Sequence, residues 1–176
     1  MDEKSWNPMS SIAPLEHDYY AAIWQLVKSG ELEKLDGKRK ILGQLMLEHP
    51  EYQYFWEVPY AFAETELQEA FEHEGVNPDL HLTVEQIICE QIEKEDPPEA
   101  GKAYKALLRA GVAPHESRHA IGRVLTAVIW QISHMAPGQK PDENIYINEL
   151  RRLAKHPLKV LNEQVTKLRK GLCCLR

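Results

Sequence analysis

Residues 107–134 read LLRAGVAPHESRHAIGRVLTAVIWQISH, and this stretch decides the fold class. Gly111 ends one apolar helical pattern, and Pro114 opens the longest such pattern in the chain, expected as a helix over 115–134. Apolar residues recur here at the spacing of a helix face rather than with the alternation of a strand. The stretch therefore predicts an all-α protein.

The same periodicity extends outward from this helix in both directions, broken by Gly, Pro or Asn. We find no hairpin signals and no strand-like alternation, so we expect no sheet. About seven to eight short helices imply an irregular multi-helix bundle. The other expected helices span residues 15–29, 38–48, 59–75, 79–94, 99–110, 142–155 and 157–170, with an aromatic-rich connection at 49–56.

The 176 residues suffice for one domain with a sizeable core, so we interpret 1–176 as a single helical domain. Its more aromatic and more acidic first part, 1–75, is a candidate sub-lobe. Residues 76–135 would form the core that carries the chemical motifs, and 142–170 would add the C-terminal helices.

The composition indicates which kinds of partner and which cellular compartment to expect. A net charge of −6 argues against a nucleic-acid partner, because phosphate binding needs a basic face. No stretch approaches the roughly 18 apolar residues of a membrane span, and residues 1–14 do not read as a signal peptide. Three cysteines without a CxxC spacing fit a reducing cytoplasm. We expect a cytoplasmic protein whose helical or aromatic surfaces are available for homo-oligomer formation.

Residues 115–119 read HESRH, an HExxH motif. Two residues four apart share one face of a helix, so His115 and His119 can reach the same ion. In zinc peptidases the intervening glutamate, here Glu116, acts as general base. Leu125 stands where the extended peptidase motif carries a third histidine, although Gly122 of that motif is present. The motif therefore indicates metal binding more than peptidase activity.

A second pair lies upstream in LHLTVEQIICEQ, residues 80–91. His81 and Glu85 are again four residues apart and share a helix face, whereas Glu90 projects in another direction. Together with His115 and His119, this pair would supply three imidazoles and one carboxylate. Such a set suits Zn, Fe, Ni or Mn held between facing helices. We therefore predict a divalent metal ion as cofactor, with these four ligands; the alternative that the spacing leaves open is four unrelated, exposed polar residues at helix ends.

Further residues could support that site. Glu116 or Glu90 would act as an acid/base group or orient a ligand. His49, which precedes the aromatic connection, is a better additional ligand candidate than His17 or His73.

Three functions stay open at this point. The first is a metal-binding helical protein, whose ion could serve hydrolytic or redox chemistry on a small molecule. The second is a non-enzymatic interaction or assembly module, in which the polar residues form a buried hydrogen-bond network that fixes helix packing. The third, least favoured, is an HExxH metallopeptidase.

Several motifs in one order also resemble the bacterial family designated domain of unknown function 1841. They are LEHPEYQYFW at 47–56, GVNPDLHLTVEQIICEQ at 75–91, DPPE at 96–99 and LLRAGVAPHESRHAIGRVL at 107–125. The resemblance covers about 75–130, with the first motif as an upstream element. It implies an intracellular helical domain and no particular activity. Family members usually carry His where this chain has Glu85, which implies a retained ligand position with a different charge.

Overall fold

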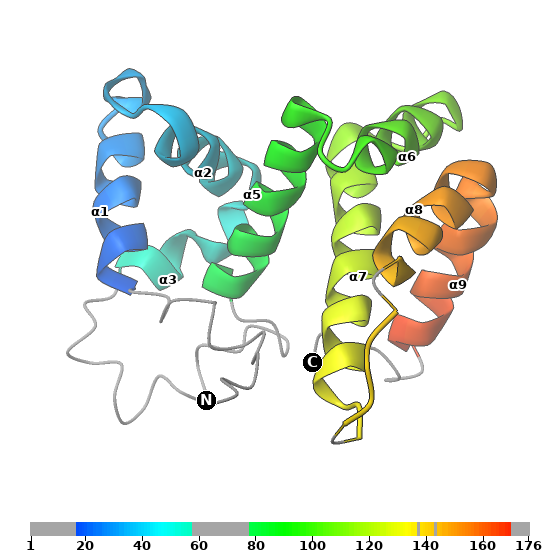
Figure 1. The fold of residues 1–176 in the computed structure, drawn as a ribbon. Helices are drawn as coiled ribbons and strands as arrows, with labels where there is room; N and C mark the ends of the chain where they lie inside the picture. Colours follow the sequence, from blue (N-terminus) through cyan, green and yellow to red (C-terminus); the bar gives the residue numbers. More distant parts are fainter. Residues whose placement is uncertain (1–16, 58–77, 137, 143, 170–176) are drawn as a thin grey trace.

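The computed structural model describes residues 17–57, 78–136, 138–142 and 144–169 (Figure 1). In these ranges the regular secondary structure is helical throughout and contains no strand, which confirms the all-α prediction. The α-helices are α1 (His17–Lys28), α2 (Gly37–Glu48), α3 (Gln53–Glu57), α5 (Pro78–Lys94), α6 (Pro98–Arg109), α7 (Pro114–Ser133), α8 (Ile145–Lys155) and α9 (Pro157–Arg169). Two 3₁₀ turns, η1 (Leu32–Lys34) and η2 (Pro50–Tyr52), connect the early helices.

Proline and glycine set many of these boundaries. Each of α5, α6, α7 and α9 begins with a proline, whose missing N–H would lack an intrahelical acceptor at that position in any case. Gly30 and Gly111 follow α1 and α6 with positive φ angles of 78° and 85°, a conformation that other residues adopt at a cost.

Two boundary expectations need correction. Residues 49–56, expected as a connection, form η2 and most of α3, because Pro50 starts a helical turn rather than only breaking one. The helix expected from residue 142 begins at Ile145 instead. The helix expected over 59–75 lies outside the described residues.

The buried side chains form two clusters that meet at α5. The first contains Trp24, Leu42 and Trp56 from α1–α3, together with Leu82 from α5. The second contains Ile88 from α5 with side chains from α6–α9. Figure 1 accordingly shows α5 between an N-terminal group, α1–α3, and a C-terminal group, α6–α9. The boundary of the expected sub-lobe near residue 75 falls outside the described residues, so the division into lobes stays a prediction.

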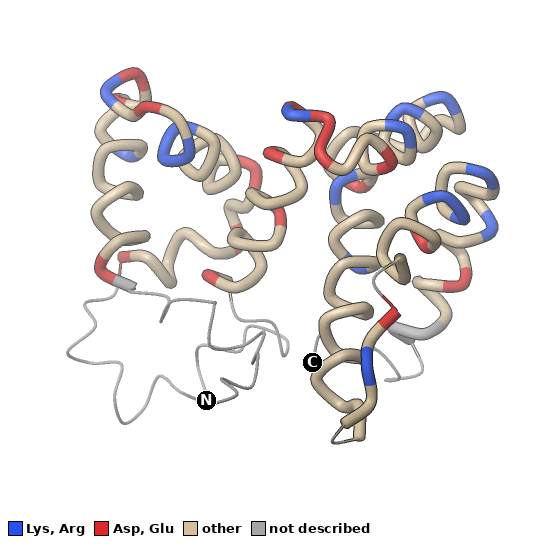
Figure 2. Tube along the Cα trace, viewed as in Figure 1, with Lys and Arg blue, Asp and Glu red and all other residues tan. Residues whose placement is uncertain are grey.

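Charged residues of both signs are interspersed along the described helices (Figure 2). Among these helices, none combines the length and the apolar character that a bilayer crossing requires.

Candidate metal centre

The facing surfaces of α5 and α7 bring the two predicted ligand pairs together. His81 Nε2 lies 3.2 Å from His119 Nε2, and Glu85 Oε2 lies 3.5 Å from the same nitrogen. The rings of His115 and His119 have centroids 4.1 Å apart. The sequence could therefore predict which residues gather here, since each pair is fixed by helix geometry and only the meeting of the helices depends on the tertiary fold.

A small residue permits this close helix contact. A Cβ atom at Gly122 of α7 would lie 3.2 Å from Val84 Cγ1 of α5, tighter than ordinary packing. Gly122 follows His119 by about one helical turn, so this tight contact with α5 lies near the histidines of α7.

His49 joins the site from the N-terminal group. It sits between α2 and η2, is 1% exposed, and places Nε2 2.9 Å from Glu85 Oε2. Its ring also contacts three neighbouring imidazoles, with centroid separations of 4.8 Å to His81 and His115 and 5.7 Å to His119. We call these five residues, His49, His81, Glu85, His115 and His119, the His/Glu cluster.

The donor atoms of the cluster lie close together. One donor atom from each of His49, Glu85, His115 and His119 lies within 4.8 Å of the other three. Donors bonded to Zn²⁺ at about 2.1 Å are separated by about 3.4 Å in a tetrahedron. Glu85 Oε2 lies at similar distances, 2.9 Å and 3.5 Å, from Nε2 of His49 and Nε2 of His119. His81 lies at the edge of this group, with Nε2 3.9 Å from Glu85 Oε2.

Two further carboxylates lie within hydrogen-bond distance of Nδ1 of two histidines. Glu51 Oε1 lies 2.9 Å from His49 Nδ1, and Glu48 Oε2 lies 3.3 Å from His115 Nδ1. Metal-bound histidines usually hydrogen bond in this way through the nitrogen that does not touch the ion.

Arg118 forms an ion pair with the buried carboxylate of Glu85. Its Nε donates to Glu85 Oε1 over 2.7 Å, and its terminal nitrogen pairs with Glu48. Glu85 is 2% exposed, and burial alone would raise its pKa; hydrogen bonds from His119, His49 and Arg118 outweigh burial and hold the pKa of Glu85 well below its usual range. The carboxylate is therefore ionised and available as a ligand at neutral pH.

The surroundings shift the pKa values of two of the imidazoles in opposite directions. Burial, together with the neighbouring imidazoles of His119 and His49, lowers the pKa of His81 to about 4, which keeps that ring neutral. Burial also acts to lower the pKa of His49, but its hydrogen bonds to Glu85 and Glu51 prevail and raise it. Each ring nitrogen of His49 faces one of these carboxylates, Nδ1 toward Glu51 and Nε2 toward Glu85.

The charges around the cluster match a divalent cation. Three carboxylates and one guanidinium leave a formal charge of −2 when every imidazole is neutral. These groups are Glu48, Glu51, Glu85 and Arg118.

Two of the predicted supporting residues lie apart from these contacts. The Glu116 side chain is 58% exposed, and its carboxylate is 3.9 Å from Arg123 rather than among the gathered donors. Glu90 pairs with Lys38 and Lys94 at the surface. Sequence reasoning gave no role at this site to Glu48, Glu51 or Arg118. The HPE sequence at 49–51 was the available signal for Glu51.

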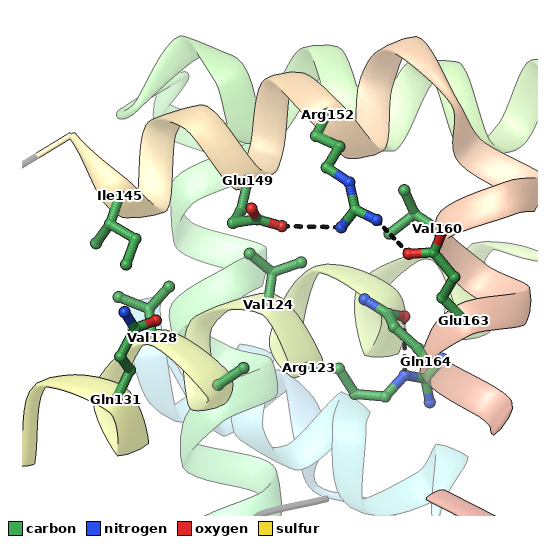
Figure 3. A pocket seen from close by; sticks show the side chains of 11 residues that line it. Arg123, Val124, Val128, Gln131, Ile145, Glu149, Arg152, Val160, Glu163 and Gln164 are labelled. Carbon is green, nitrogen blue, oxygen red and sulfur yellow. Dashed lines mark hydrogen bonds and ion pairs between the residues drawn. The ribbon is translucent and has the colours of Figure 1, made fainter. Parts of the chain in front are cut away.

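A separate cavity of about 290 Å³ lies between α7, α8 and α9 (Figure 3). Val124, Val128 and Val160 contribute apolar walls, and Arg152 pairs with Glu149 and Glu163 at its rim. No residue of the His/Glu cluster lines it.

Fold and site thus define an all-α protein with a partly buried His/Glu cluster between its helices. The sequence profile of the domain of unknown function DUF1841 matches residues 16–152, and the chain belongs to this family. No curated protein and no solved structure matches the chain.

Proposed function

We propose that this protein binds one divalent transition-metal ion in the His/Glu cluster. His49, Glu85, His115 and His119 are the principal ligands, and His81 is a fifth donor beside them. The observation that carries the proposal is that donor atoms of His49, Glu85, His115 and His119 converge to within 4.8 Å of one another and include one buried, ionised carboxylate. A set of imidazoles with one carboxylate and no thiolate suits Zn, Fe, Ni or Mn.

The ion would be accessible from one side. His49 and Glu85 form the buried floor, whereas the side chains of His81, His115 and His119 are 21%, 32% and 18% exposed. A water molecule or small substrate could complete the coordination sphere from that side, which would permit hydrolytic or redox chemistry.

Metal analysis of protein purified without a histidine tag tests the proposal. We expect one ion per chain in the wild type, strong loss in His49→Ala and His115→Ala, and partial loss in His81→Ala. His134→Ala is the matched control, because His134 stacks on the exposed Trp130 at the far end of α7. A folded wild type that takes up no Zn²⁺, Fe²⁺, Ni²⁺ or Mn²⁺ would contradict the proposal.

The second candidate is an interaction or assembly module whose polar cluster is structural. One observation favours it: Glu85 joins His49 to Arg118 through hydrogen bonds between side chains. If this function is correct, adding divalent ions to the metal-free protein should leave its Tm unchanged.

Peptidase activity is the least favoured function. The exposed position of Glu116 beside Arg123 does not direct its carboxylate to the gathered donors. We expect no cleavage of casein, and Glu116→Gln should retain the metal content of the wild type.

A further inference from the structure

Two carboxylates on one short segment each approach a different histidine of the cluster. Glu48 ends α2 and Glu51 lies in η2, on either side of His49. Glu51 reaches Nδ1 of His49, and Glu48 crosses to Nδ1 of His115 on α7. Both contacts use the same ring nitrogen, although the two histidines come from different parts of the chain.

A histidine can bind an ion through either nitrogen, and the partner of the other nitrogen decides which one is free. A carboxylate at Nδ1 keeps the proton there and leaves the lone pair on Nε2. For His49, Nε2 is the atom 2.9 Å from Glu85 Oε2, so it already faces the buried carboxylate.

Glu48 also links the ligands to one another. Its Oε2 accepts from Arg118 as well as from His115, and Arg118 donates in turn to Glu85 Oε1. Arg118 thereby occupies one oxygen of Glu85 and leaves Oε2 facing the imidazoles, at 2.9 Å from His49 and 3.5 Å from His119.

We propose that Glu48 and Glu51 are positioning residues that make His115 and His49 bind the ion through Nε2, and that Arg118 restricts Glu85 to coordination through Oε2. This assignment rests on the proposed metal site and adds to it the residues that set its geometry and affinity. In this arrangement the segment 48–51 supplies one ligand and orients two.

Metal affinity provides the first test. Dissociation constants for Zn²⁺ and Co²⁺ would be measured by competition with a chromophoric chelator at fixed pH. We expect Glu48→Ala and Glu51→Ala to weaken binding by about 10–100-fold each. Glu48→Gln and Glu51→Gln should lose less, because the amide oxygen still accepts a hydrogen bond from Nδ1–H. Glu33→Ala is the matched control, since Glu33 is an 84% exposed glutamate of the same N-terminal group that pairs with Lys40.

Nitrogen NMR of the Zn²⁺-loaded wild type provides a test that does not depend on variants folding. In both His49 and His115, we expect Nδ1 to carry the proton. We expect the chemical shift of Nε2 to change when the metal binds. The Co²⁺ form of the Glu48 and Glu51 alanine variants should also show an altered visible absorption spectrum, which Glu33→Ala should not.

The possible outcomes distinguish the proposed metal site from the proposed positioning roles. A wild type that binds no metal overturns the metal site and this assignment with it. A wild type that binds metal through Nδ1 of His49 or His115, or alanine variants with affinities within twofold of Glu33→Ala, overturns the positioning roles alone.

Discussion

At the scale of single residues, Glu85 is the buried charge on which the site depends. It is 2% exposed and is contacted by His49, which precedes η2, and by Arg118 and His119 of α7. Such a carboxylate is stable only while its partners remain, because an uncompensated charge in the interior is costly.

Replacing Arg118 should therefore destabilise the fold. We expect Arg118→Met to lower the free energy of unfolding by about 3 kcal/mol, since it leaves Glu85 buried without its guanidinium partner. Chemical denaturation of the metal-free protein measures the change. Arg109→Met is the control, because Arg109 is exposed and donates to the Lys105 carbonyl one turn away. Equal losses in both variants would contradict a special role for Arg118.

A second buried hydrogen bond anchors the start of α5 to α3. Trp56 Nε1 donates to Asp79 Oδ1 over 3.0 Å, and the two residues are 1% and 4% exposed. We expect Trp56→Phe to cost about 2 kcal/mol, because it removes a donor from a buried carboxylate as well as apolar contacts. Trp130→Phe, at a 47% exposed site, should change stability by less than about 0.5 kcal/mol in the same denaturation experiment.

At the scale of elements, the distance between α5 and α7 decides whether the ligand pairs meet. Gly122 is the position on α7 where an added side chain would press on Val84. We expect Gly122→Val to lower the free energy of unfolding by about 1–3 kcal/mol through overpacking. It should also weaken Zn²⁺ binding, because the displaced helix carries His115 and His119.

Gly101 in α6 offers the contrasting helix position. A Cβ atom there meets nothing within 4 Å, and the residue lies inside a helix without a positive φ angle. Gly101→Ala should therefore stabilise the protein by about 0.5–1 kcal/mol by reducing the backbone entropy lost on folding. Thermal unfolding distinguishes the two substitutions, and a destabilised Gly101→Ala would show that space around α6 is tighter than the structure indicates.

At the scale of the whole molecule, the His/Glu cluster joins the N-terminal group to the C-terminal group through α5. His49 belongs to the first group, His115 and His119 belong to the second, and Glu85 lies on the helix between them. An ion bound to all of them would connect the two hydrophobic clusters and would be released on unfolding.

Metal should accordingly raise the stability of the whole chain. At a free Zn²⁺ concentration of 100 times Kd, linkage adds about 2.7 kcal/mol, provided that the unfolded chain does not bind the ion. For a protein of this size, we expect Tm to rise by about 5–10 °C and to fall back after addition of a chelator. His115→Ala should abolish the increase, whereas an equal increase in that variant would indicate binding elsewhere.

The amino-acid sequence by itself determined the helical class, many helix starts and the two pairs of candidate ligands. Prolines and glycines act on the backbone at their own positions, and residues four apart share a helix face wherever the helix lies. These are local effects, so His81 with Glu85 and His115 with His119 could be paired without knowledge of the fold. The same local geometry points Glu116 about 100° away from His115 around the helix axis, consistent with its exposed position.

Only the tertiary structure decided that His49 enters the cluster and that Glu48 and Arg118 connect its ligands. His49 and Glu85 are separated by 36 positions, and Glu48 and Arg118 by 70. Contacts across such separations depend on how α2, α5 and α7 pack, which follows from burial of the hydrophobic clusters on both sides of α5 rather than from any local pattern.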